Sequence, residues 1–454
     1  MRYIFIVLLG FVFFGCASKE PEIKELLIQT EENITKEEII VLQNKEISDL
    51  VNIPQDVKYF TQRVNFEQLH FKPQEKFEKL YFRVWNINKP SDTRTQAKWP
   101  FYAYRYGDSY GENLQLIEQE FFQQMKLNAN FDSYGTLNKR AIMLQDANIR
   151  SFPTIKPLLR DPSIAGEGFP FDYLQNSSVQ ANKPVFVSHY SQDKEWVFIF
   201  SSFTSGWVRA NEIVFLKKEY TDRWQKAQQI HLTQENIPLY TMQGKFVFKS
   251  KIGMMLALVS EEKNYYTALA VSVYKASEPL FVTIKVPKNI AVKNVLKFNK
   301  KNLDLIISEV AKSNYGWGGM YGQRDCSSTL RDLFAPFGIW LPRNSFMQSK
   351  MGKVVQLENL SDLQKIKIIK EKAIPFQTLL YKKGHIVLYV GTYNGEIIVF
   401  HNTWGIKTNH DGVEGRIVVG RSIFSTLRLG KEQPYYDEEA EMLTNLKSMN
   451  ILGI

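Results

Sequence analysis

The pattern of apolar and polar positions changes twice along the chain. Residues 56–150 mix short amphipathic stretches, the clearest at 111–127, where apolar residues recur at helical spacing. From residue 151 short apolar runs alternate with turn residues, as in 184–190 and 195–201, which predicts β-strands. After residue 299 helical spacing returns over 302–314, and two strand-like runs follow over 382–405.

These patterns predict an α+β multidomain protein. A mixed helical domain is expected over 56–150, followed by an SH3-like domain over 151–216, because short, regularly spaced strands favour a small β-barrel. The stretch SGWVRANEI resembles a strand near the end of bacterial SH3-like domains. A second SH3-like β domain is expected over 217–298, then an α+β domain over 299–430 and a tail over 431–454.

The first residues read as a targeting signal. Arg2 precedes an apolar run over 3–14, which is shorter than the roughly 20 residues that a membrane-spanning helix needs. The ending Phe-Phe-Gly-Cys resembles a bacterial lipobox, with phenylalanine where leucine is usual. It implies a signal peptide over 1–15, a lipid on Cys16 and a linker over 16–55; Ala17 suggests the periplasmic side of an outer membrane. An uncleaved anchor or a fortuitous cysteine is the alternative.

Composition and charge limit the classes of binding partner that the chain is expected to have. With 44% hydrophobic residues the chain can bury several cores, and its net charge is +10. The Lys and Arg residues are scattered, without a dense block interleaved with aromatics, which argues against nucleic acid. Attraction to an anionic surface such as cell wall or lipid headgroups fits better. We expect a monomer without cofactor or metal.

Cys326 is one of only two cysteines. If Cys16 carries lipid, Cys326 has no partner for a disulfide within the chain, and a leftover cysteine in an exported protein is a candidate reactive thiol. Asp325 is a good helix N-cap, so Cys326 is expected at the first helical position, where the helix end favours thiolate. The plain alternative is a buried structural cysteine, with Asp325 as a helix cap only.

A base for this thiol is predicted in the hairpin over 382–405, which begins with His385 and ends with His401. A two-residue Asn394-Gly395 turn would set His401 opposite Leu388, whereas a longer loop with a bulge brings the two histidines opposite each other. In that arrangement His385 is the base and His401 fixes its tautomer. Two ordinary strand residues are the alternative.

A different orienting residue and a metal site are less well supported. Asn402 could also orient the base, but strand alternation turns it to the opposite face of the sheet. Metal binding is a poor reading, because there is no histidine pair at helical spacing.

Several motifs in the last third of the chain occur in a familiar order. Over residues 315–405 they read YGWGG, RDCSS, LPRNSFMQ, GHIVLYVG and VFHNTWG. Their order and spacing resemble the NlpC/p60 family of papain-like cysteine peptidases, which cleave peptidoglycan stem peptides and often carry SH3-like domains upstream. The resemblance implies a papain-like domain over 299–430, in which a helix packs on an antiparallel sheet.

The resemblance also implies roles for single residues. Cys326 would be the nucleophile, His385 the base, His401 the third polar residue and Tyr315 a donor to the oxyanion. Two departures affect the groove: Ser328 stands where the family usually has glycine, and LLYKKGH replaces the customary Pro-Gly-Asp before the histidine strand.

Substrate contacts are implied for three more residues. In relatives with paired SH3-like domains, the residues matching Asp325 and Ser327 look like a clamp for the free amine of an N-terminal L-alanine. Such a clamp would favour peptides already stripped of sugar, with an SH3-like barrel excluding glycan-linked stems. Ser345 is a further candidate on the substrate side.

The reaction implied is hydrolysis of the bond between γ-D-glutamate and the diamino acid of the stem peptide, through a thioacyl intermediate. The partners are peptidoglycan or its stem-peptide fragments, and the membrane through the lipid. Two alternatives stay open: a wall-binding lipoprotein without activity, and a Cys/His amidase or acyltransferase acting on another acyl group.

Overall fold

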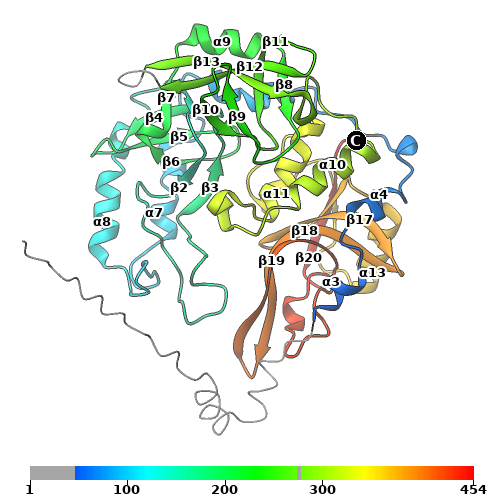
Figure 1. Cartoon of the computed structure of the whole chain (residues 1–454). Helices are drawn as coiled ribbons and strands as arrows, with labels where there is room; N and C mark the ends of the chain where they lie inside the picture. The colour runs from blue at the N-terminus through cyan, green and yellow to red at the C-terminus, as the bar shows by residue number, and fades with distance from the viewer. Residues whose placement is uncertain (1–45, 274–277) are drawn as a thin grey trace, which may run out of the picture. The chain divides into compact units, whose positions relative to one another are not determined.

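The structure is a computed structural model that describes residues 46–273 and 278–454. It contains short helices, two seven-stranded sheets and one six-stranded sheet, which confirms the predicted α+β multidomain fold (Figure 1). The signal over 1–15, Cys16 and most of the linker lie outside the described residues. No helix in the described part of the chain is long and apolar enough to cross a membrane.

Short helices form the N-terminal region. They are α3 (Ser48–Asn52), α4 (Val57–Thr61), α5 (Phe77–Tyr81), α6 (Arg94–Ala97), α7 (Pro100–Ala103) and α8 (Gln119–Asn128). The first two do not belong to a separate linker or domain. Phe60 stacks on Phe424 with ring centroids 4.9 Å apart, and the Asp49 carboxylate accepts a hydrogen bond from the Thr426 N–H at 2.7 Å. The apolar face of α4 is therefore part of the C-terminal core.

The first seven-stranded sheet has the order β3-β2-β6-β5-β4-β1-β7. Its strands are β1 (Lys139–Met143), β2 (Ala147–Arg150), β3 (Gln175–Val179), β4 (Pro184–Tyr190), β5 (Trp196–Phe200), β6 (Ser205–Arg209) and β7 (Ile213–Phe215). The sheet begins earlier than the predicted boundary at 151, because β1 pairs with both β4 and β7.

The second seven-stranded sheet follows α9 (Lys218–Lys226) and has the order β10-β9-β13-β12-β11-β8-β14. Its strands are β8 (Gln229–Leu232), β9 (Pro238–Thr241), β10 (Phe246–Lys249), β11 (Met255–Glu261), β12 (Tyr265–Val273), β13 (Pro279–Pro287) and β14 (Ala291–Val292). Every strand pair in it is antiparallel, as expected for a small β domain.

The C-terminal sheet has the order β15-β20-β16-β17-β18-β19. Its strands are β15 (Lys353–Gln356), β16 (Thr378–Lys382), β17 (His385–Tyr393), β18 (Glu396–His410), β19 (Val413–Thr426) and β20 (Leu446–Ile451). Residues 431–454 are thus no tail, because β20 pairs with both β15 and β16.

The helices of this domain are α10 (Lys300–Val310), α11 (Cys326–Phe334), α12 (Ser345–Gln348) and α13 (Asp362–Lys372). Leu330, Phe334, Ile386 and Phe400 share one buried core, which joins α11 to β17 and β18 (Figure 1). This is the predicted helix packed on an antiparallel sheet.

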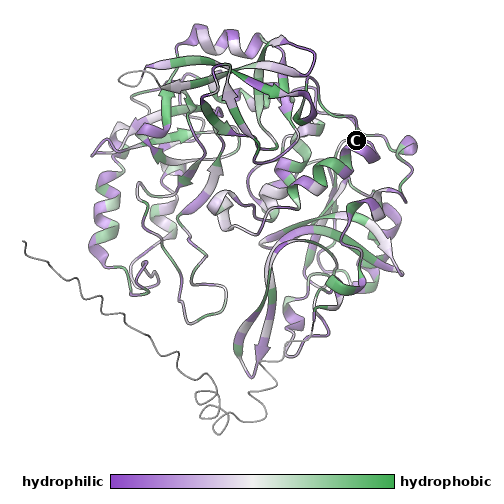
Figure 2. Ribbon diagram, in the orientation of Figure 1, coloured by the Kyte–Doolittle hydropathy of each residue, from purple (hydrophilic) through white to green (hydrophobic). Residues whose placement is uncertain are grey.

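β18 and β19 continue beyond the other strands as a long hairpin. Their pairing extends from Ile398↔Thr426 to His410↔Val413, with Lys407 opposite Arg416. Figure 2 shows both hydrophilic and hydrophobic residues along the far half of the hairpin.

The segment before α11 lies tightly against the first sheet. Gly318 and Gly319, within the 3₁₀ segment η6 (Trp317–Gly322), have positive φ values of 59° and 81°. A Cβ at Gly318 would lie 2.4 Å from the Gln175 carbonyl oxygen, and one at Gly319 would lie 2.4 Å from Ser178 Oγ. These two glycines therefore permit both the turn and the close approach of the two backbones.

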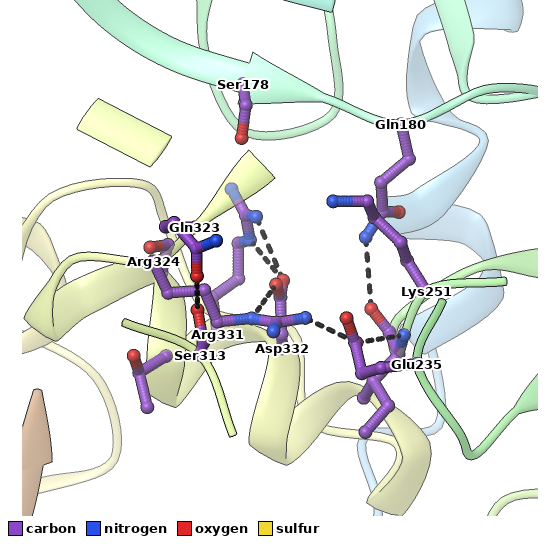
Figure 3. A network of polar contacts seen from close by, with 12 residues as sticks. Ser178, Gln180, Glu235, Lys251, Ser313, Gln323, Arg324, Arg331 and Asp332 are labelled. Carbon is purple, nitrogen blue, oxygen red and sulfur yellow. Dashed lines mark hydrogen bonds and ion pairs between the residues drawn. The ribbon is translucent and has the colours of Figure 1, made fainter. Parts of the chain in front are cut away.

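Arg324 joins the same segment to the second β domain. Its buried guanidinium donates to Glu235 Oε1 at 2.6 Å and to Asp332 Oδ2 of α11 at 2.8 Å (Figure 3). Burial opposes its charge, but the two carboxylates raise the pKa of Arg324, so the guanidinium stays charged. One buried ion network thus ties α11 to residues between β8 and β9.

Candidate functional site

Cys326 occupies the first position of α11, as the N-cap argument predicts. The Asp325 carboxylate accepts a hydrogen bond from the Ser328 N–H at 2.8 Å, and Ser328 Oγ accepts one from the Asp325 N–H at 2.9 Å. The serine that departs from the family's usual glycine therefore completes a capping box. Cys326 is 8% exposed, and its thiol lies against the backbone N–H of Ile386, the residue after His385.

The two histidine rings meet across β17 and β18. His385 Nε2 lies 2.8 Å from His401 Nδ1. The loop is not the longer one expected: Tyr393 pairs with Glu396, which leaves a two-residue Asn394-Gly395 turn. The register shifts by one residue between Tyr389 and Gly391, where β17 has a bulge. This extra residue in the strand, and not a longer loop, puts both rings on one face of the sheet.

The hydrogen bonds around His401 determine which nitrogen of each ring carries a proton. Ser425 Oγ donates to the Thr426 carbonyl oxygen at 2.9 Å, so it accepts from His401 Nε2, also at 2.9 Å. Neutral His401 then accepts at Nδ1 from His385 Nε2–H, which leaves Nδ1 of His385 as an unprotonated base. Sequence reasoning missed Ser425, which lies 24 residues beyond His401 in sequence.

The replacement of Ser425 by alanine tests whether its hydrogen bond fixes the tautomers of the two histidines. We expect kcat for peptide hydrolysis to fall about tenfold with KM unchanged, because the His401 tautomer is no longer fixed. Ser422→Ala on the same strand is the matched control, since its buried hydroxyl has no hydrogen-bond partner within the described residues. Equal kcat values for the two variants would show that Ser425 does not act on the histidines.

Burial determines the protonation of the thiol and the base. It raises the pKa of Cys326 to about 12, with the charge of Asp325 adding to the effect. It lowers the pKa of His385 to about 3, helped by the charge of Lys382. Burial therefore opposes the thiolate expected at the helix end and favours a neutral thiol beside a neutral imidazole in the protein without substrate.

This neutral pair predicts the pH dependence of alkylation at Cys326. The thiolate fraction is small at neutral pH, so the rate of modification by iodoacetamide should rise about tenfold per pH unit between pH 7 and 10. Peptide-level mass spectrometry measures this rate at Cys326 alone. A rate that stays constant from pH 5 to 8 would instead indicate a thiolate–imidazolium pair.

Asp325 and Ser327 have an internal partner. Arg343 donates to Asp325 Oδ2 at 2.6 Å and to Ser327 Oγ at 2.9 Å, and all three side chains are buried. The guanidinium occupies the place that the resemblance gives to a substrate amine. Their assignment as an open amine clamp is therefore not supported, because a ligand would first have to displace Arg343.

Arg343 also reaches the first β domain, where Ser177 Oγ accepts from its Nε at 2.7 Å. Nothing near Asp325 in sequence signals this contact. Ser345 begins α12, and this helix is tied to α11 because Gln348 Nε2 donates to the Ser327 carbonyl oxygen at 2.8 Å. Asn402 likewise bonds the Arg324 carbonyl oxygen at 3.0 Å and takes no part in the histidine pair.

A cleft of about 390 Å³ opens beside the histidines. Tyr315, His385 and His401 line it together with residues of the first β domain and of the β18–β19 hairpin. Burial, and then the neighbouring acidic groups of Cys326 and Asp325, hold the pKa of Tyr315 well above its usual value, so its hydroxyl stays a donor.

Aromatic side chains from two domains form one wall of this cleft. Phe171 lies edge-on to Trp317 and Trp404, with centroid distances of 5.3 and 5.4 Å. Trp317 Nε1 donates to the Asp172 carbonyl oxygen at 2.9 Å. The first β domain is thus part of the site.

Comparisons with known proteins agree with this architecture. Four family models match: an NLPC_P60 stabilising domain (N term) at residues 5–134, an SH3 domain of SH3b1 type at 157–209, an SH3 domain of SH3b2 type at 220–263 and the NlpC/P60 family at 312–418. No curated protein matches the chain.

Two solved structures are similar. An NlpC/P60 endopeptidase from Photobacterium damselae subsp. piscicida has 24% identity and a TM-score of 0.73, over 88% of this chain and 97% of that one. An NlpC/P60 family protein from Bacillus cereus ATCC 10987 has 15% identity and a TM-score of 0.47, over 69% of this chain and 100% of that one. The first likeness establishes the shared fold.

Proposed function

The chain belongs to the NlpC/P60 family, and from this premise we propose that it is a cysteine endopeptidase that hydrolyses the γ-D-glutamyl–diamino acid bond of peptidoglycan stem peptides. The observation that carries the proposal is that the Cys326 thiol lies against the backbone N–H of Ile386, next to His385, while His385 and His401 meet at 2.8 Å and both line the cleft. A helix N-terminus, a base and an orienting group are what a thiol nucleophile requires.

The reaction begins from the neutral pair. As Cys326 Sγ attacks the amide carbonyl, its proton passes to Nδ1 of His385, and His401 stabilises the imidazolium that forms. The Tyr315 hydroxyl donates to the developing oxyanion. His385 then gives its proton to the leaving amine, the C–N bond breaks and a thioester remains. Water attacks the thioester, with His385 as base, and the acid product and free thiol are released.

The first β domain limits what can reach the thiol. Its residues Gly166, Glu167, Phe171 and Tyr173 line the cleft opposite the sheet that carries the histidines. This wall narrows the approach to the thiol. A free peptide can enter the cleft, whereas a stem peptide still attached to glycan is excluded by the bulk of the sugar.

We propose a periplasmic location, with the protein held to the outer membrane by a lipid on Cys16. The support is the lipobox-like ending of the first 16 residues. Labelling with a fatty-acid analogue should mark the wild type, and Cys16→Ala should abolish the label.

The function is tested with defined substrates. Purified protein is incubated with intact sacculi, with L-Ala-γ-D-Glu-diaminopimelate and with its N-acetylated form, and products are identified by mass; Cys326→Ala is the control for contaminating peptidases. We expect cleavage between D-Glu and diaminopimelate, with similar rates for the free and acetylated peptides because Arg343 occupies Asp325. Products from another bond would support the amidase or acyltransferase alternative. Sacculus binding without products would support the wall-binding alternative.

A further inference from the structure

Two cations of the cleft have no carboxylate partner among the described residues. Lys382 Nζ donates only to the Ala440 carbonyl oxygen, at 2.9 Å, and Arg416 has no ion pair in that part of the chain. Both residues are half-buried and line the cavity that contains the histidines. Partial burial weakens the hydration of these two cations, so an anion from outside the chain would be bound favourably beside them.

The other charged groups of the cleft do not supply that anion. Four cationic side chains line it, against the two carboxylates of Glu167 and Asp437. Asp437 pairs with Lys407 at 3.2 Å, and Glu167 accepts a hydrogen bond from the Tyr173 hydroxyl at 2.7 Å. Glu414, near the same hairpin, also pairs with Lys407. Among the described residues neither carboxylate is ion-paired with Lys382 or Arg416, and with four cations against two carboxylates the cavity keeps a net positive charge.

The fold holds both cations close to the base. Lys382 pairs directly with His385 across β16 and β17, so their side chains share one face and start about 5 Å apart. Lys382 belongs to the LLYKKGH segment in which the chain departs from the family's usual sequence. Lys382 and Arg416 line the same cavity, and burial and then the charge of Arg416 lower the pKa of Lys382.

Arg416 is held over the cleft by the first β domain. Its Nε lies 3.0 Å from the position that a Cβ on Gly166 would occupy, so the β18–β19 hairpin lies against this loop. A larger residue at 166 would push the guanidinium away. The pairing of Lys407 with Arg416 across the hairpin fixes its position from the other side.

These positions identify the side of the substrate that meets the cations. Cys326 and Asp325 belong to α11, whereas Lys382, His385 and Arg416 all belong to the C-terminal sheet. Because His385 protonates the leaving amine, the residue that carries this amine lies along the sheet. We propose that Lys382 and Arg416 together bind a carboxylate of the residue that leaves on cleavage. This inference rests on the proposed function for the identity of the leaving residue.

The carboxylate can come from the main chain or from the side chain of that residue, and four peptides separate the two sources. L-Ala-γ-D-Glu is joined to diaminopimelate or to lysine, each with a free or an amidated main-chain carboxyl group. Calorimetry with Cys326→Ala protein measures Kd without turnover, and the otherwise wild-type protein gives KM and kcat. Lys382→Gln and Arg416→Gln are introduced into both, with Lys301→Gln, an exposed lysine of α10, as the control for lost charge.

We expect the peptide that offers the bound carboxylate to have a Kd about tenfold below that of its neutral counterpart, as a charge-assisted contact predicts. Each variant should remove this preference and raise KM with kcat unchanged, while Lys301→Gln retains it. If only amidation of the main chain weakens binding, the main-chain carboxylate is the bound group. If only the change from diaminopimelate to lysine weakens binding, the side-chain carboxylate is the bound group.

The inference and the proposed function can fail separately. Equal Kd values for all four peptides, or no binding of any, overturn the inference even if the protein cleaves them. Charge-dependent binding without cleavage by the wild type supports the carboxylate site and overturns the peptidase.

Discussion

Replacing Cys326 by alanine should remove stem-peptide hydrolysis, with kcat/KM reduced by at least about 10³-fold, while the fold and the binding of peptide are retained. The thiol lies against the Ile386 N–H, next to His385, whereas the Ser425 hydroxyl beside His401 already donates to the Thr426 carbonyl oxygen. Cys326 shares its hydrophobic core with residues such as Leu330 and Ile386, which the substitution leaves in place. Removing one sulfur atom should therefore lower the free energy of unfolding only slightly. Product formation by mass and calorimetric Kd measure the two properties.

His385→Ala is the companion variant. A thiol with a pKa of about 12 depends on a base for its proton, so we expect a loss in kcat that approaches that of Cys326→Ala. Residual activity of Cys326→Ala near the wild-type level would refute the assignment of the nucleophile. A mild effect of His385→Ala would refute the general-base role.

The second large effect concerns stability. Arg324→Met should lower the free energy of unfolding by about 3–5 kcal/mol, because it leaves the Glu235 carboxylate buried without its cation and Asp332 with Arg331 alone (Figure 3). Arg324 is 4% exposed, so water cannot replace the guanidinium without opening the contact between domains. Urea unfolding followed by tryptophan fluorescence measures the change.

Two further variants make this test specific. Arg421→Met, the same substitution at an exposed position of β19, should change the free energy of unfolding by less than about 0.5 kcal/mol. Glu235→Gln retains a hydrogen-bond acceptor and should cost less than Arg324→Met. A loss below about 1 kcal/mol for Arg324→Met would mean that the network does not hold α11 to the second β domain.

Local signals were enough to predict the start of α11. Asp325 followed by an apolar helical face determines where the helix begins, and the apolar runs on either side of Asn394-Gly395 predict the two strands that carry His385 and His401. These features depend on neighbouring residues, so they can be read from sequence. The bulge that brings the two rings together could not be predicted from the sequence, because no neighbouring residue distinguishes a bulge in the strand from a longer loop.

The contacts that complete the site come from distant residues. Arg343 fills the supposed amine clamp from 18 positions beyond Asp325, and Ser425 fixes the histidine tautomers from another strand. Burial opposes the ionisation expected for Cys326, since helix-end effects are local whereas desolvation depends on the whole core. Tertiary packing, not spacing along the chain, decides these features.

The position of β20 has a consequence for biosynthesis. Because residues 446–451 insert between β15 and β16, the sheet beneath the histidines is incomplete until this segment has left the ribosome. Until then β15 has no neighbour and one edge of β16 is open to pairing with other chains. A product that ends before residue 446 would therefore be aggregation-prone, because the sheet that carries the histidines is complete only once β20 has joined β15 and β16.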